Sequence, residues 1–168
     1  MSSLYDVSNV DPDALNLKNM MDQVLEKVTS VFTSYGVPLP SRCYWTMGEP
    51  AIDCEQLVVS FVQVYLGMPG DQAATPQRCH MPRTAVLTVS IAREVPVVGQ
   101  NGRPPSGEKI EQGSYLSAVD AWVLMESMKS FDPWDDGIPG MGVIATVDAS
   151  TAEGGFQVVN MQLSVVVP

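Results

Sequence analysis

The first strong pattern of apolar and polar positions runs from about Pro12 to Tyr35 and predicts a helix. Its apolar residues recur at intervals of three and four, so they share one face. Asp11 can accept hydrogen bonds from the free amides of the first turn, and a proline at the first helical position loses no backbone bond. Gly36, with Pro38 and Pro40 after it, ends the helix because glycine readily adopts the left-handed conformation that follows a helix. The predicted apolar stripe comprises Leu17, Met20, Met21, Val24, Val28, Val31 and Tyr35.

Three strands are predicted between this helix and the next one. Arg42–Met47 is short and aromatic, whereas Glu55–Leu66 has apolar side chains at positions of both parities, which is typical of a central strand. Arg83–Val95 alternates between larger apolar side chains and small or polar ones, which predicts a third strand. Two irregular stretches, Gly67–Pro82 and Pro96–Gly107, follow the second and third strands and are longer than a compact domain needs.

A second helical pattern covers about Glu108 to Phe131. Gly113 weakens its beginning by about 1 kcal/mol relative to alanine, so we expect this helix to start late. The turn-forming sequence Asp132–Gly137 ends it, and Met141–Ala149 and Phe156–Val167 predict two further strands joined by a turn. The apolar positions of the helical pattern are Ile110, Tyr115, Val119, Trp122, Val123, Met125 and Met128.

The predicted order α-β-β-β-α-β-β indicates an α+β fold. Each helix has an apolar face that a sheet must cover, and strands joined by short turns are antiparallel. We therefore expect about five strands in an antiparallel or mixed sheet, with both helices packed on one face. The length of 168 residues favours a single domain over 1–168, with 1–11 as a flexible N-terminal segment.

The charge of the chain excludes one broad class of function. Nine Lys and Arg residues against 19 Asp and Glu residues give a net charge of −10. A protein that grips nucleic-acid phosphates needs clustered Lys and Arg, so specific nucleic-acid binding is not expected. No apolar run approaches the length of about 18 residues that a membrane span requires, and the first residues lack the regions of a signal peptide.

Side chains that could carry chemistry are few. The three cysteines, Cys43, Cys54 and Cys79, are an odd number, so we expect buried free thiols, while one disulfide with one remaining thiol stays open. The one histidine, His80, adjoins Cys79 in sequence, a geometry that suits neither a zinc site nor a Cys–His nucleophilic pair. If the chain were an enzyme, the only candidate catalytic residues would be Cys79, His80 and Asp53. We predict no catalytic residue, no cofactor and no metal site.

Two surface features favour interactions with other proteins. The irregular stretches Gly67–Pro82 and Pro96–Gly107 contain prolines, which lower the entropic cost of ordering when a partner binds. Ten methionines could supply adaptable apolar surface for a partner. The same composition is also explained if the loops are ordinary surface loops and the methionines belong to the hydrophobic core. The predicted interface residues are Met68, Asp71, Gln77, Arg78, His80, Val98, Gln100, Asn101, Arg103 and Trp134.

Several motifs together resemble a known group of proteins. Trp45–Leu57 (WTMGEPAIDCEQL) leads into a valine-rich strand and a Gly-Met-Pro-Gly loop, which are followed by Cys79 and Arg83–Ala85. Arg93–Pro96, a Pro-Pro loop and a helix that contains Asp120–Trp122 complete the set. With these motifs, most of the chain resembles the tail terminator and related neck proteins of long-tailed actinobacterial phages.

The resemblance implies a virion protein that is assembled in the host cytoplasm and is not an enzyme. Small α+β subunits of this group close into a sixfold ring that caps the tail tube and faces the head–tail connector or stopper. The implied partners are other copies of the chain, the tail tube protein and the connector, while genomic DNA passes through the lumen without specific binding. Another neck protein, a head–tail stopper or a head-completion protein, is the first alternative. A small-ligand-binding α+β domain is the second, and it would need a deep apolar pocket between helices and sheet.

Overall fold

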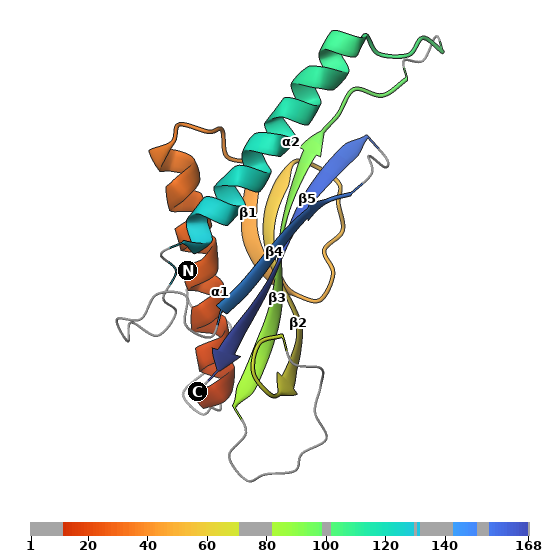
Figure 1. Ribbon diagram of the computed structural model, residues 1–168. Helices are drawn as coiled ribbons and strands as arrows, with labels where there is room; N and C mark the ends of the chain where they lie inside the picture. The colour runs from red at the N-terminus through yellow and green to blue at the C-terminus, as the bar shows by residue number, and fades with distance from the viewer. Residues whose placement is uncertain are drawn as a thin grey trace, which may run out of the picture.

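The computed structural model describes residues 12–70, 82–98, 102–129, 131, 143–150 and 155–167. Within these ranges the chain forms two helices and five strands in the predicted order α-β-β-β-α-β-β, so the predicted α+β fold is confirmed (Figure 1). Neither helix is long and apolar enough to cross a lipid bilayer. The elements are α1 (Pro12–Ser34), β1 (Arg42–Met47), β2 (Gln56–Leu66), β3 (Arg83–Glu94), α2 (Gly107–Met128), β4 (Val143–Ala149) and β5 (Phe156–Val167).

Helix α1 ends as its sequence predicts. Gly36 adopts a φ of 66°, and the backbone N–H of Val37 donates a hydrogen bond of 3.0 Å to the carbonyl of Phe32. Phe32 is fully buried and completes the apolar stripe, a position that the sequence pattern missed. Tyr35, predicted to belong to the stripe, is instead 53% exposed, because the helix has already ended at that point. The buried members of the predicted stripe are Met20, Met21, Val24 and Val28.

The five strands form one mixed sheet in the order β1-β2-β3-β5-β4. β1 and β2 are parallel, and the other three pairs are antiparallel. β2 has a neighbour on each side, as its two-sided apolar pattern predicts, but β3 rather than β2 is the middle strand. Because parallel neighbours cannot be joined by a hairpin turn, residues 48–55 cross from the end of β1 to the start of β2. This crossover segment (48–55) matters for the surface described below.

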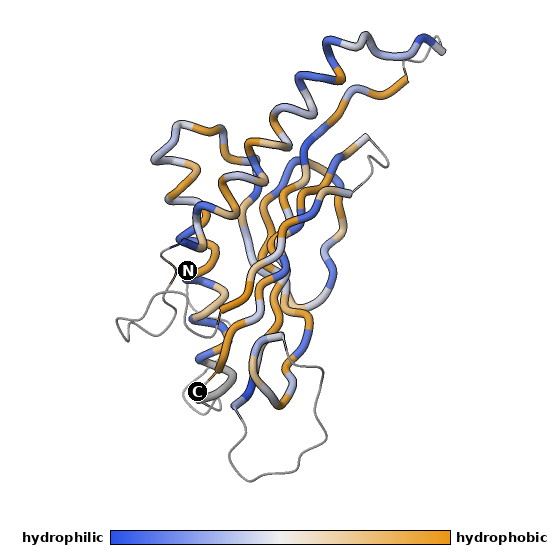
Figure 2. Tube along the Cα trace, viewed as in Figure 1, coloured by the Kyte–Doolittle hydropathy of each residue, from blue (hydrophilic) through white to orange (hydrophobic). Residues whose placement is uncertain are grey.

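Both helices cover the same face of the sheet, as predicted. α1 contacts β1 and β2, whereas α2 contacts β3, β4 and β5, and the two helices also contact each other (Figure 1). Alternating residues of the inner strands point into this layer, and Figure 2 shows the central strands as largely hydrophobic. The side chains between helices and sheet form one continuous buried cluster, which includes Leu57, Val59, Leu87, Val89, Ile91, Met161 and Leu163.

Helix α2 begins at Gly107, within one residue of the predicted Glu108, so Gly113 does not delay its start as expected. A Cβ added at Gly113 would lie 3.6 Å from the Pro96 side chain and 3.8 Å from that of Val95. The helix therefore packs closely on the segment that follows β3, and this contact offsets the low helix propensity of glycine. These first turns of α2 and residues 95–98 and 102–106 extend together beyond the other strands, and we refer to them as the arm (Figure 1).

The cysteines are less buried than predicted. Cys43 and Cys54 are both free thiols, but Cys43 is exposed on the edge strand β1 and Cys54 is half-buried in the crossover segment. The Cys43 Sγ lies 3.7 Å from the carbonyl oxygen of Pro40, and partial burial of the sulfur raises the pKa of this thiol. Cys79 lies outside the described residues, as do residues 1–11, most of the Gly67–Pro82 loop and the predicted helix stop at Asp132–Gly137.

Candidate interaction surface

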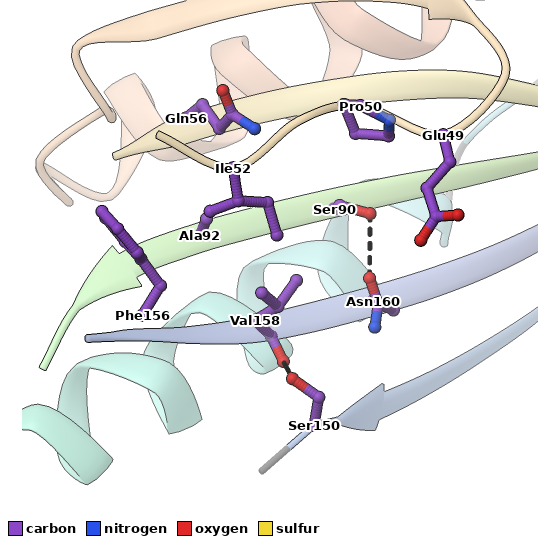
Figure 3. Close-up of a pocket in the computed structure, with 10 residues that line it drawn as sticks. All are labelled: Glu49, Pro50, Ile52, Gln56, Ser90, Ala92, Ser150, Phe156, Val158 and Asn160. Carbon is purple, nitrogen blue, oxygen red and sulfur yellow. Dashed lines mark hydrogen bonds between the residues drawn. The ribbon is translucent and has the colours of Figure 1, made fainter. Parts of the chain in front are cut away.

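The face of the sheet opposite the helices carries the crossover segment and, beside it, an open groove. Val58 alternates with the core residues Leu57 and Val59, so it points to this face, and it is nevertheless fully buried. Figure 3 shows the crossover segment on this face of the sheet, beside β2. Two adjoining hollows of about 570 Å³ each lie between the segment and strands β2, β3 and β5. They share Glu49, Pro50, Ser90 and Asn160, so together they form one groove.

Polar side chains form the floor of the groove. The Ser90 hydroxyl donates a hydrogen bond of 2.8 Å to Asn160 Oδ1 across the β3–β5 pair (Figure 3). Thr88 and Gln162 are the next pair along the same two strands. Ser60 is 4% exposed, and its Oγ has no hydrogen-bond partner among the described residues. Apolar side chains, among them Ile52, Phe156 and Val158, line the groove beside these polar groups, so it offers both hydrogen-bonding and apolar contacts.

The charged residues at the groove are acidic. Glu49 projects from the crossover segment toward the strands, and Asp148 lies beside Asn160 on β4. The residues that line the two hollows include no histidine, cysteine or lysine, and no group of three or more metal-ligating side chains occurs in the described part of the chain. The carboxylates of the groove can therefore accept hydrogen bonds and repel anions.

Hydrogen bonds at both of its ends hold the crossover segment in place. Arg42 of β1 forms a two-fold ion pair with Asp53, with N–O distances of 3.0 and 3.3 Å. The Gln56 side chain donates to the carbonyl oxygen of Ala51 at 2.8 Å, and the Gly48 N–H donates to the carbonyl of Phe61 at 3.2 Å. Asp53, one of the candidate residues for an enzyme that the sequence suggested, is thus the partner of an arginine.

A buried ion pair joins the base of the arm to both helices. Arg93, at the end of β3, donates from Nε and one terminal nitrogen to the two carboxylate oxygens of Asp120 on α2, both at 2.9 Å. The same terminal nitrogen donates to the carbonyl of Pro38 after α1 at 2.7 Å, and Glu55 lies 3.8 Å from the guanidinium. Burial raises the pKa of Asp120, and the hydrogen bonds from Arg93 oppose this effect in part. The cluster fixes the direction in which the arm leaves the sheet.

The predicted interface residues do not form one surface. Met68 follows β2 and Val98 follows β3, and both are exposed, at 49% and 61%. Because β2 and β3 are antiparallel, these residues lie at opposite ends of the sheet, about 40 Å apart for a twelve-residue strand. Arg103 is exposed in the arm on the Val98 side. The other predicted interface residues, Asp71, Gln77, Arg78, His80, Gln100, Asn101 and Trp134, lie outside the described residues.

The sequence pattern missed one apolar surface. Tyr115, Trp122 and Met125 were assigned to the buried face of the second helix, but they are 73%, 46% and 46% exposed. Val123 and Met128 are buried as predicted, and they are joined by Leu124 and the polar Ser117 and Asp120, which the pattern did not include. Because α2 has apolar residues on both faces, the periodicity of its sequence contains no signal that separates the buried face from the exposed one.

Comparison with known proteins identifies no family or homologue for this chain. The chain matches no protein-family model, and no curated protein is significantly similar to it in sequence.

Proposed function

We propose that this chain is a structural subunit of the neck of a long-tailed phage, a tail terminator that forms a ring by head-to-tail association. The proposal rests on the sequence resemblance of most of the chain to that group and on three physical features. These features are the two free edges of the sheet, the contact regions at its opposite ends and the strong negative charge.

The free sheet edges carry the proposal. In the described part of the chain, β1 and β4 each pair on one side only, and they have similar lengths of six and seven residues. The sequence of parallel and antiparallel pairs across the sheet leaves β1 and β4 running in opposite directions. The β4 edge of one copy can therefore pair antiparallel with the β1 edge of the next copy. Such a heterologous contact repeats around a ring and leaves no edge exposed.

The two ends of the sheet suit two different neighbours. A subunit between a tail tube and a head connector needs one contact region on each side of the ring. Met68, with the other described residues that follow β2, lies at one end of the sheet, whereas Val98, Arg103 and the arm lie at the other. The separation of the predicted loops is thus in keeping with a connector.

The charge suits a channel for DNA. Each copy carries a net charge of −10, so a ring of copies is strongly negative. A negative wall repels phosphates and allows DNA to slide without binding. The ligand-binding alternative has less support, because the described side chains between helices and sheet pack as one continuous cluster, and the groove lies on the other face of the sheet.

Cysteine cross-linking tests the ring contact. Cys43 is exposed on β1 and faces the helix side of the sheet, since it pairs with Leu57. In a background with Cys54→Ser and Cys79→Ser, a cysteine on the same side of β4 should form a disulfide with Cys43 of the next copy, because the two Cα atoms can then approach within about 7 Å. Cysteines on the opposite side of β4 are the matched controls. The test positions are Val143, Ala145 and Val147, and the control positions are Ile144, Thr146 and Asp148.

A ladder of cross-linked species that ends at a closed ring is expected for the test positions and not for the controls. Electron microscopy should show rings, and addition of purified tail tube protein should place these rings at the ends of the tubes. A chain that stays monomeric alone and with tube protein refutes the proposed function. Rings that bind head connector but not tube ends would instead identify another neck protein.

A further inference from the structure

The face of α2 that turns away from the sheet carries a second apolar stripe. Tyr115, Ala118, Trp122 and Met125 are all exposed, and their spacing of three, four and three is that of the contact positions in a pair of packed helices. Glu111 and Lys129 continue the stripe at either end and are also exposed. We call these six residues the outer stripe: Glu111, Tyr115, Ala118, Trp122, Met125 and Lys129.

The outer stripe is large enough to form the centre of an interface. Aromatic side chains present about 150–250 Å² each, so the exposed fractions of Tyr115 and Trp122 amount to about 250 Å². Tyr35 of α1 extends the patch, because its ring packs edge-on against Trp122 with 4.6 Å between centroids and is itself 53% exposed. With Met125 the patch reaches the range of about 300–600 Å² that is often functional on a monomer. A standard interface buries about 800 Å² per partner, so polar residues must form its rim.

The outer stripe is complementary to its own reversed copy. Its members lie in pairs at equal distances from residue 120: 118 with 122, 115 with 125, and 111 with 129. When two α2 helices pack antiparallel about a twofold axis at this position, Ala118 faces Trp122 of the second copy, and Tyr115 faces Met125. Glu111 then faces Lys129 of the second copy at both ends of the pair.

Each of these contacts is favourable on general grounds. A small residue opposite a large one allows two helices to interdigitate. The sulfur of methionine packs well against an aromatic ring. Lys129, directly after α2, is 70% exposed, so it can reach a carboxylate of a second copy in exchange for its ion pair with Glu126. A twofold contact uses every one of these pairs twice.

We propose that two copies of this chain associate through the outer stripes of α2, packed antiparallel about a twofold axis near residue 120. This contact is isologous and lies on the helix layer, whereas the ring contact proposed above is heterologous and lies at the sheet edges. The two contacts share no described residue, so either can fail without the other. If both form, two rings join through their helix layers.

Sedimentation velocity over a concentration series tests the pairing. The wild-type chain should form pairs, or assemblies with an even number of copies. Trp122→Glu places a charge at the centre of the apolar patch and should weaken the association at least about 30-fold, as expected for a central aromatic anchor. Val64→Glu is the matched control, since Val64 is also 46% exposed but lies on β2, away from the outer stripe. The control should associate as the wild type does.

A charge exchange tests the antiparallel register. Glu111→Lys and Lys129→Glu each set like charges together at both ends of the pair, and each should weaken the association by about 5- to 30-fold. The double variant exchanges the charges and should restore the wild-type affinity to within about threefold. These residues are exposed, so the substitutions leave the core intact. A wild-type chain without pairs, an unchanged Trp122→Glu variant, or a double variant as weak as the single ones would each overturn the proposal.

Discussion

Replacing Asp120 by alanine removes the acceptor from the buried ion pair at the base of the arm. Arg93 is 3% exposed, and its guanidinium forms three good hydrogen bonds, two to Asp120 and one to the carbonyl of Pro38. In the Asp120→Ala variant one of these three remains, and Glu55 at 3.8 Å is the nearest carboxylate. The variant thus keeps a buried, charged arginine that has lost its ion-pair partner and two of its three hydrogen bonds.

The expected loss of stability follows from this geometry. Removing one partner of a buried ion pair costs about 3–5 kcal/mol, because the other charge stays buried. Glu55 is 36% exposed and can move toward Arg93, so we expect the lower end, about 3 kcal/mol. For a domain of this size that corresponds to a decrease of Tm by about 6–12 °C. Arg93→Met should cost a similar amount, because it leaves the fully buried Asp120 without a donor.

Urea unfolding followed by tryptophan fluorescence measures these free energies. The matched control is the double variant Arg93→Met/Asp120→Leu, which replaces both charges by apolar side chains of similar size. Since an apolar replacement of a buried ion pair is often nearly neutral, the double variant should lose about 1 kcal/mol or less. A loss in Asp120→Ala below about 1 kcal/mol, or a double variant as unstable as the sum of the single variants, would refute the reasoning.

Three further predictions concern single positions. Ser60→Ala should raise the free energy of unfolding by about 1 kcal/mol, because it removes a buried hydroxyl that has no hydrogen-bond partner among the described residues. Ser90→Ala should lower the free energy of unfolding by about 1 kcal/mol, because the hydrogen bond to Asn160 is lost. Both are measured by urea unfolding, and a loss in Ser60→Ala would contradict the first. Gly36→Ala should cost about 1 kcal/mol in thermal unfolding, because a φ of 66° strains a residue with a Cβ even though the space is free. Gly36→Asn should cost less, and an equal cost for both variants would speak against backbone strain as the cause.

Local patterns in the sequence were sufficient for the helices and strands. The spacing of apolar residues, together with Gly36, predicted α1 to within one residue of its end. The short aromatic run predicted β1 and the alternating pattern predicted β5, both with the bounds that the structure has, and the order of elements led to the correct fold class. These features depend on neighbours a few positions apart, so a sequence contains them directly.

The tertiary structure decided how these elements pair and which of their faces are covered. The parallel β1–β2 pair, the central place of β3 and the crossover segment over the open face come from contacts between distant residues. The separation of Met68 from Val98 follows from the antiparallel course of β2 and β3. The exposure of Trp122 was likewise beyond the sequence, because α2 has apolar residues on two faces and periodicity does not say which of them packs on the sheet. That choice depends on the free energy of the whole packed layer, to which the Arg93–Asp120 pair and the shape of the sheet contribute.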